Sequence, residues 1–86
     1  MPTVEVRITG DTVTPNAEQV DVGRDDSILF EIVSDRPGEL HVHSKPEQYV
    51  EFGKGRTRAE IAIATPGSVE VEEHDTSRVV AVLDVR

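Results

Sequence analysis

The chain of 86 residues contains no cysteine and no tryptophan. Without cysteine it can form no disulfide, and it offers neither a thiol nucleophile nor a thiolate metal ligand. Aromatic side chains make up only 3% of the residues, so the apolar residues are mostly valine, isoleucine and alanine. Valine and isoleucine branch at Cβ and favour strands over helices. The composition therefore indicates a β-rich core.

Long hydrophobic runs and clustered basic residues are also missing. No segment approaches the roughly 18 apolar residues of a membrane-spanning helix, and the start of the chain lacks the basic and apolar regions of a signal peptide. Nine Lys and Arg residues stand against 17 acidic ones, for a net charge of −8. Because phosphate binding needs clustered Lys and Arg, we expect neither nucleic acid nor an anionic membrane surface as a partner. Cations and basic proteins are favoured.

Apolar and polar residues alternate along most of the chain, whereas a period of 3.6 is almost absent. Turn sequences such as Asp35-Arg36-Pro37-Gly38 and Thr65-Pro66-Gly67 separate the alternating segments. This pattern predicts one all-β domain, residues 1–86, that forms a sandwich of about seven or eight strands. The predicted strands cover 4–9, 16–22, 28–34, a segment around His41 and His43, 48–52, 58–64, 69–73 and 79–85. The segment 28–34 is apolar enough for a central strand covered on both faces.

The three histidines lie in two short segments. His41 and His43 are two residues apart on a predicted strand, so they point the same way with a spacing of about 6.6 Å. A metal ion sits about 2.0 to 2.1 Å from each imidazole nitrogen, so both rings can converge on one ion. His74 follows another alternating segment, 68–73. These residues predict a metal site; the alternative is that they are hydrogen-bonded surface histidines.

The order of these elements resembles the cupredoxin-like domains over nearly the whole chain. The resemblance rests on Val13-Thr14-Pro15, the segment 28–35, the histidine strand, Pro66-Gly67 and a final valine-rich strand. It implies a Greek-key β-sandwich with a copper site at one end. It also implies that His41 matches the first histidine ligand and His74 the second. Because domains of this family often belong to exported proteins, we expect an extracytoplasmic (periplasmic or secreted) location, although this chain carries no signal peptide.

One departure from the family pattern changes the expected chemistry. Blue-copper sites need a cysteine thiolate and a weak axial ligand such as methionine. The only methionine here is Met1, and counting from Pro66-Gly67 places the thiolate position at or beside Glu73. We therefore expect a non-blue site for Cu(II), with Zn(II) as the alternative, and not blue-copper electron transfer. The expected ligands are the three histidines, with an oxygen from Glu73 or Glu72.

Two other functions compete with metal binding. A metal-free scaffold can serve as an interaction module of an exported protein or larger system, with a protein partner that the sequence does not identify. An enzyme is not expected, because the chain has no Ser-His-Asp or Cys-His set and no phosphate-binding glycine loop. Hydrophobicity slightly favours Leu40 and Val42 as core residues, which turns the histidines outward; in the alternative, the histidines point inward and the buried rings need hydrogen-bond partners. The metal hypothesis predicts that His41→Ala and His74→Ala weaken copper binding more than His43→Ala.

Overall fold

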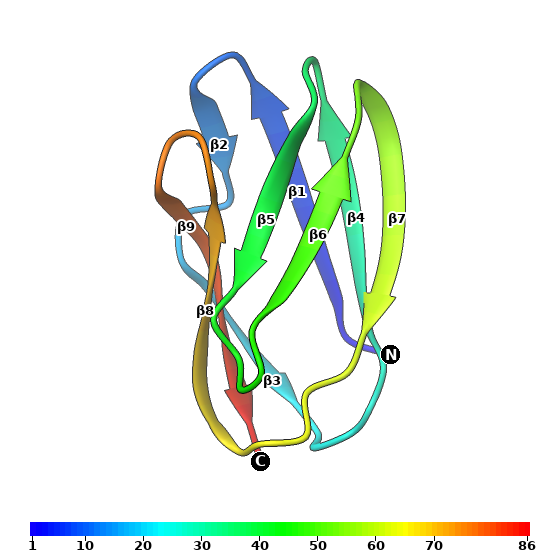
Figure 1. Ribbon diagram of the computed structural model, residues 1–86, viewed down its shortest axis with the longest axis vertical. Helices are drawn as coiled ribbons and strands as arrows, with labels where there is room; N and C mark the ends of the chain where they lie inside the picture. The colour runs from blue at the N-terminus through cyan, green and yellow to red at the C-terminus, as the bar shows by residue number, and fades with distance from the viewer.

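A computed structural model describes residues 1–86 as nine β-strands in two sheets (Figure 1). The four-stranded sheet has the order β2-β1-β4-β7, and the five-stranded sheet has the order β3-β9-β8-β5-β6. No helix is present, and so none that is long and apolar enough to cross a membrane. The all-β sandwich expected from the alternation is confirmed, with nine strands instead of seven or eight. The strands are β1 (Thr3–Thr9), β2 (Thr12–Thr14), β3 (Glu18–Val22), β4 (Ile28–Ser34), β5 (Gly38–Val42), β6 (Gln48–Phe52), β7 (Gly55–Ile61), β8 (Gly67–Glu73) and β9 (Arg78–Val85).

Both sheets mix parallel and antiparallel pairs. β1 pairs with β4, and β3 with β9, in parallel, whereas all other neighbours are antiparallel. β4 lies between β1 and β7, which confirms its predicted interior position. Its outward side chains, such as Leu29 and Val33, are only partly buried, so the expected cover on both of its faces is not found. The outer side of this sheet faces solvent.

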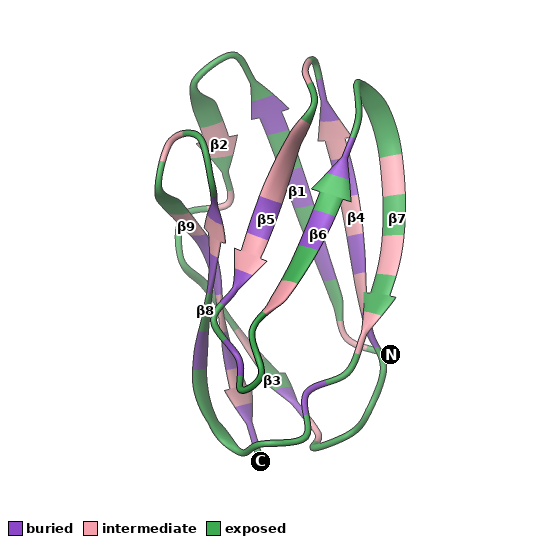
Figure 2. Cartoon of the chain, viewed as in Figure 1, coloured by how far each residue is buried: buried purple, intermediate pink, exposed green.

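The core lies between the sheets and follows the period of two in the sequence (Figure 2). β1 shows the rule, because Val4, Val6 and Ile8 are buried while the residues between them are exposed. Eighteen buried apolar residues form one continuous cluster. Burying one such side chain contributes about 1.5 to 3 kcal/mol relative to leaving it in water. The alternation therefore determines which side chains face the core, and burial of these side chains stabilises the packing of the two sheets.

Two strands differ most from the sequence prediction. β2 was not predicted, because its three residues carry a single apolar side chain, Val13, and three residues are too few to show a period. β7 begins at Gly55 and ends at Ile61, three residues earlier than predicted at each end. Its limits follow from pairing with β4, where Gly55 lies opposite Ser34 and Ile61 opposite Ile28.

The histidine strand has the expected orientation. Leu40 and Val42 on β5 are fully buried. His41 points to the outside and is half-buried, and His43 follows directly after the strand and is exposed. The prediction that the two apolar residues face the core is confirmed. Both imidazoles consequently lie on the outer face of the five-stranded sheet.

Candidate metal site on the outer sheet face

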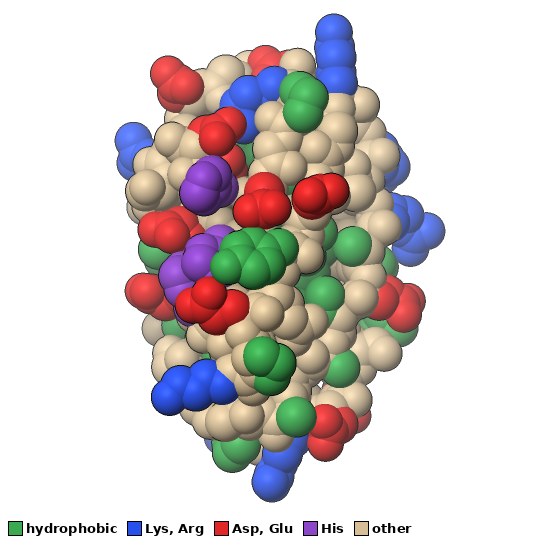
Figure 3. Space-filling view, viewed as in Figure 1, with side chains coloured by type: hydrophobic (Ala, Val, Ile, Leu, Met, Phe, Trp, Pro, Cys, Tyr) green, Lys and Arg blue, Asp and Glu red, His purple; other side chains and the backbone are tan.

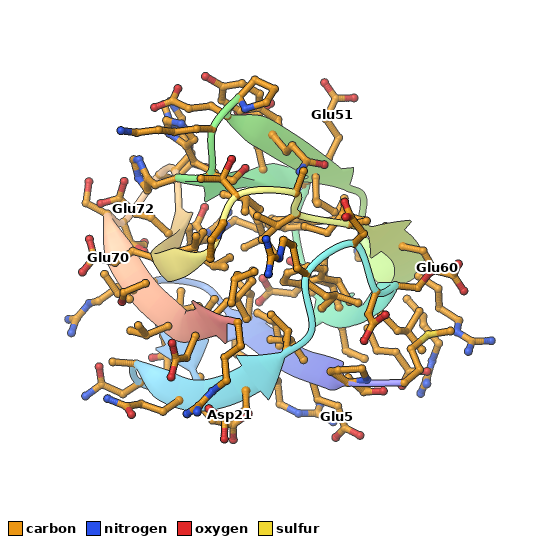
Figure 4. All side chains as sticks on the ribbon, turned by 90° about the horizontal axis from the view of Figure 1, so that it is seen from below. Glu5, Asp21, Glu51, Glu60, Glu70 and Glu72 are labelled. Atoms are coloured by element: carbon orange, nitrogen blue, oxygen red, sulfur yellow. The ribbon has the colours of Figure 1, made fainter.

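A cross-strand row brings three functional side chains together. On the outer face of the five-stranded sheet, Glu72 of β8 lies opposite His41 of β5, and His41 lies opposite Tyr49 of β6. Neighbouring strands are about 4.8 Å apart, so side chains in one row are in reach of one another. Figure 4 shows Glu72 projecting away from the sandwich interior. Residues some 30 positions apart in sequence therefore share one surface site.

Two members of this row, His41 and Glu72, converge with His43, which follows β5. His41, His43 and Glu72 each present one ligand atom within 4.8 Å of the other two. His43 Nε2 lies 3.3 Å from Glu72 Oε1. A second carboxylate, that of Glu47, lies on the other side of the pair, with Oε2 3.0 Å from His41 Nε2 and Oε1 3.8 Å from His43 Nδ1. Two imidazoles thus sit between two carboxylates.

Ring stacking holds the imidazoles in place. The ring centroids of His41 and His43 are 4.0 Å apart with an angle of 28° between their planes. The ring of Tyr49 stacks on the other face of His41 at 4.6 Å and 25°. The Tyr49 hydroxyl also donates a hydrogen bond to Glu47 Oε2 at 3.2 Å. Three rings and one carboxylate therefore support one another before any ligand arrives.

The charge around the two imidazoles is negative. The hydrogen bond from His41 holds the pKa of Glu47 below its ordinary value, against a smaller opposing effect of desolvation. Desolvation, followed by the hydrogen bond to Glu47, raises the pKa of Tyr49. Acidic side chains surround the histidines on this face (Figure 3). A cation is the ligand that such a surface attracts.

The structure places Glu73 away from this cluster. It points inward from β8, and its side chain is fully buried. Burial alone would raise its pKa, but hydrogen bonds from Arg36 and from the backbone and side chain of Thr76, together with the Asp75 backbone, leave the pKa below its ordinary value. The Arg36 Nη2 to Glu73 Oε1 distance is 2.9 Å. The glutamates of β8 therefore lie in different environments: Glu70 is exposed, whereas Glu73 is a core residue.

His74 also lies outside the cluster. Its backbone N–H donates to the Glu39 carbonyl at 3.0 Å, and its side chain is exposed. It follows Glu72 by two residues, which is about 6.6 Å along a strand. Its ring is not part of the group of donors within 4.8 Å.

Glu47 is the member of the cluster that sequence reasoning missed. The signal for it is the hairpin between β5 and β6, where Val42 pairs with Gln48. Because the chain folds back on itself over residues 43–47, the side chains of His43 and Glu47 meet at the mouth of the turn.

Comparison with known proteins concerns the fold. No family model matches the chain, and no curated protein matches its sequence. Among solved structures, a purple cupredoxin from Nitrosopumilus maritimus superposes with a TM-score of 0.71 over 100% of both chains at 10% identity. A reduced Cu(I) form of an amicyanin mutant gives a TM-score of 0.66, with 98% of this chain and 82% of that chain covered at 10% identity. The chain has a cupredoxin-like fold. The resemblance seen in the sequence is confirmed at this level.

A larger neighbour has the same fold in one part of its chain. A multicopper oxidase superposes with a TM-score of 0.68 at 15% identity, where 99% of this chain covers 44% of that one. The cupredoxin-like domain thus spans less than half of that enzyme.

The blue-copper site that the fold family implies does not fit the residues of this cupredoxin-like domain. It has no cysteine, and its only methionine is Met1. At the expected thiolate position, the carboxylate of Glu73 is occupied by its ion pair with Arg36 and by hydrogen bonds from Asp75 and Thr76. The convergent donors lie instead on the outer face of the β6-β5-β8 sheet. Their imidazole and carboxylate chemistry fits a divalent transition metal.

Proposed function

We propose that this cupredoxin-like domain binds one divalent transition metal ion through His41, His43 and Glu72. Cu(II) is the first candidate, because imidazole suits it and the Irving–Williams order places it above Zn(II), the alternative. The observation that carries the proposal is the convergence of these three donors, from β8, β5 and the residue that follows β5, within 4.8 Å. The site is non-blue, since no thiolate is available to it. The domain binds metal and is not proposed as an enzyme.

The distances between the donor atoms are close to what an ion requires. Two ligand atoms that are each about 2.0 to 2.1 Å from one ion lie at most about 4.2 Å apart. Donors spread over 4.8 Å therefore need to close by less than about 1 Å. The stacked rings of His41 and His43 must also turn, because the lone pair of an imidazole nitrogen lies in the plane of its ring, and side-chain rotation is the movement that both changes need.

Glu47 lies beside this site and is not one of the three proposed ligands. Histidine ligands usually donate their second ring N–H to a carboxylate, which orients the ring and strengthens the ligand. The Oε1 atom of Glu47 lies 3.8 Å from His43 Nδ1, on the side of the ring opposite the Nε2 that faces Glu72. That distance is longer than a hydrogen bond, so Glu47 acts on His43 through charge, whereas it accepts a hydrogen bond from His41 Nε2 at 3.0 Å.

The first test is a titration of the metal-free protein with Cu(II), followed by calorimetry and by electron paramagnetic resonance. We expect one ion per chain with a Kd below about 1 µM and hyperfine coupling to imidazole nitrogen. His41→Ala and His43→Ala should each weaken binding by at least about tenfold. His74→Ala is the matched control and should bind Cu(II) like the parent protein.

This ranking differs from the one that the sequence suggested, where His74 mattered more than His43. Absence of saturable binding, or equal binding by the parent and a His41→Ala, His43→Ala double variant, would contradict the metal site. A metal-free interaction module would then be the better description of the domain. The extracytoplasmic location expected from the family resemblance stays a prediction.

A further inference from the structure

We propose that this site distinguishes the oxidation states of copper, so that it holds Cu(II) and releases the metal after reduction to Cu(I). The inference rests on the proposed function, because it needs a site that binds Cu(II). It makes copper the cargo of the domain and not a resident electron-transfer centre.

All donors in the cluster are nitrogen or oxygen atoms. Glu72 approaches the imidazole pair from β8, with its Oε1 3.3 Å from His43 Nε2. Glu47 approaches from the other side, with its Oε2 3.0 Å from His41 Nε2. The only sulfur atom of the chain belongs to Met1. Cu(II) accepts imidazole and carboxylate in tetragonal sites, whereas Cu(I) prefers soft thiolate or thioether ligands. The cluster therefore offers Cu(II) what it prefers and offers Cu(I) only its two imidazoles.

The imidazole pair cannot easily hold Cu(I) by itself. Two imidazoles alone bind Cu(I) in a linear arrangement, with the rings on opposite sides of the ion. Here the rings of His41 and His43 stack side by side, 4.0 Å apart with 28° between their planes. Either ion requires the rings to leave this stack, because the lone pair of an imidazole nitrogen lies in the ring plane. The linear arrangement on opposite sides of Cu(I) needs the larger rotation and also breaks the stack of His41 on Tyr49. The backbone cannot compensate, because β5 is held between β6 and β8.

Charge favours the same oxidation state. Glu47 and Glu72 bring two negative charges to the imidazole pair. The two positive charges of Cu(II) neutralise both carboxylates, whereas the single charge of Cu(I) leaves one negative charge in excess. The side chains of Glu47 and His43 are 52% and 38% exposed, so a departing ion has a direct path to solvent.

The release step is a simple one-electron exchange. A one-electron reductant such as ascorbate gives one electron to the bound Cu(II), which becomes Cu(I), and the ascorbate becomes its radical. No bond of the protein is made or broken apart from those to the ion. Cu(I) then passes to an acceptor that offers thiolate or thioether ligands. The side chains return to the His41–Glu47 and His43–Glu72 pairs seen in this structure.

The experiment loads the full chain with one equivalent of Cu(II) and passes it through a desalting column under nitrogen, with or without ascorbate. We expect nearly all copper to stay with the protein without ascorbate, and retention to fall at least about tenfold with ascorbate. Retention of Cu(I) at the original stoichiometry would overturn this inference and leave the metal site intact. Failure to bind Cu(II) at the outset would overturn the proposed function, and this inference with it.

A gain-of-function variant tests the cause. Glu72→Met replaces an oxygen donor of the cluster with a thioether, and we expect this variant to retain copper after ascorbate is added. Glu51→Met is the matched control, because Glu51 is exposed on β6 and Figure 4 shows it projecting well away from Glu72. The control should lose Cu(I) like the parent. If Glu72→Met, with an unchanged circular dichroism spectrum, also loses Cu(I) like the parent, donor softness is not the cause and the inference is wrong.

Discussion

Arg36 Nη2 lies 2.9 Å from Glu73 Oε1, and the side chain of Glu73 has no exposed surface. The same guanidinium donates from Nε to the carbonyl of Gly10 at 3.1 Å and from Nη1 to Asp75 Oδ2 at 3.2 Å. Arg36 therefore joins the β1–β2, β4–β5 and β8–β9 connections at one end of the sandwich, where Figure 1 shows the three loops together. An ion pair ties this end of the molecule together, where the family resemblance implied a copper site.

The first prediction concerns this ion pair. Arg36→Met leaves the buried carboxylate of Glu73 without its cationic partner, which should lower the free energy of unfolding by roughly 3 kcal/mol. Urea denaturation of the metal-free protein measures the change. Arg58→Met is the control, because Arg58 pairs with Glu31 on the exposed face and should cost less than about 1 kcal/mol. An equal loss of unfolding free energy in the two variants would show that the buried Arg36–Glu73 ion pair contributes no more to stability than an exposed pair.

The second prediction concerns acid stability. Since the pKa of Glu73 lies below the ordinary value of 4.5, the folded state prefers the ionised carboxylate. Its contribution is complete above that ordinary value and is lost as the pH falls through the lower, folded-state pKa. Glu73→Gln should therefore be less stable than the parent at about pH 7, and the difference should narrow at about pH 3. Urea midpoints at the two pH values give the comparison; a difference independent of pH would contradict it.

The third prediction concerns close packing at Gly38. A Cβ atom added there would lie 2.5 Å from Phe52 Cζ and 2.9 Å from Arg36 Nη1, so both side chains would have to move. Gly38→Ala should lower the stability by about 1 to 3 kcal/mol. Gly53→Ala is the matched control, because a Cβ atom at Gly53 meets nothing within 4 Å. Thermal unfolding of the two variants checks the prediction, which fails if Gly53→Ala is the more damaging change.

The fourth prediction concerns Glu47. The hydrogen bond from His41 is the largest cause of its lowered pKa, and the Tyr49 hydroxyl makes a smaller contribution in the same direction. In the metal-free protein, His41→Ala should move the pKa of Glu47 up toward 4.5, and Tyr49→Phe should move it by less. Carboxyl carbon chemical shifts, followed by NMR over an acid titration, report this group directly. A Glu47 pKa that is the same in His41→Ala and the parent would show that Glu47 does not interact with His41 in solution.

Local patterns predicted much of this fold. The alternation of Val4, Val6 and Ile8 with polar residues identified β1, and the apolar character of Leu40 and Val42 predicted their inward orientation. Such patterns are readable because the side chains of a strand alternate between its two faces in every context. Elements without a local pattern were missed or misplaced. β2 is too short for a period, and the start of β7 depends on its pairing with β4.

Only part of the candidate site could be predicted from the sequence, for a related reason. His41 lies on β5 and His43 directly follows that strand, so their spacing of two residues in the sequence was enough to predict that they share a face and are in reach of one ion. Glu72 joined them only because β8 pairs with β5 in the register that sets Glu72 opposite His41. The same register carries His74 two residues past that row. Glu73 faces the core by the alternation along β8, and the tertiary structure places Arg36 against it. Facing is a local property of the pleated backbone, whereas the choice of ligands depends on the pairing of strands far apart in the chain, which only the tertiary structure decided.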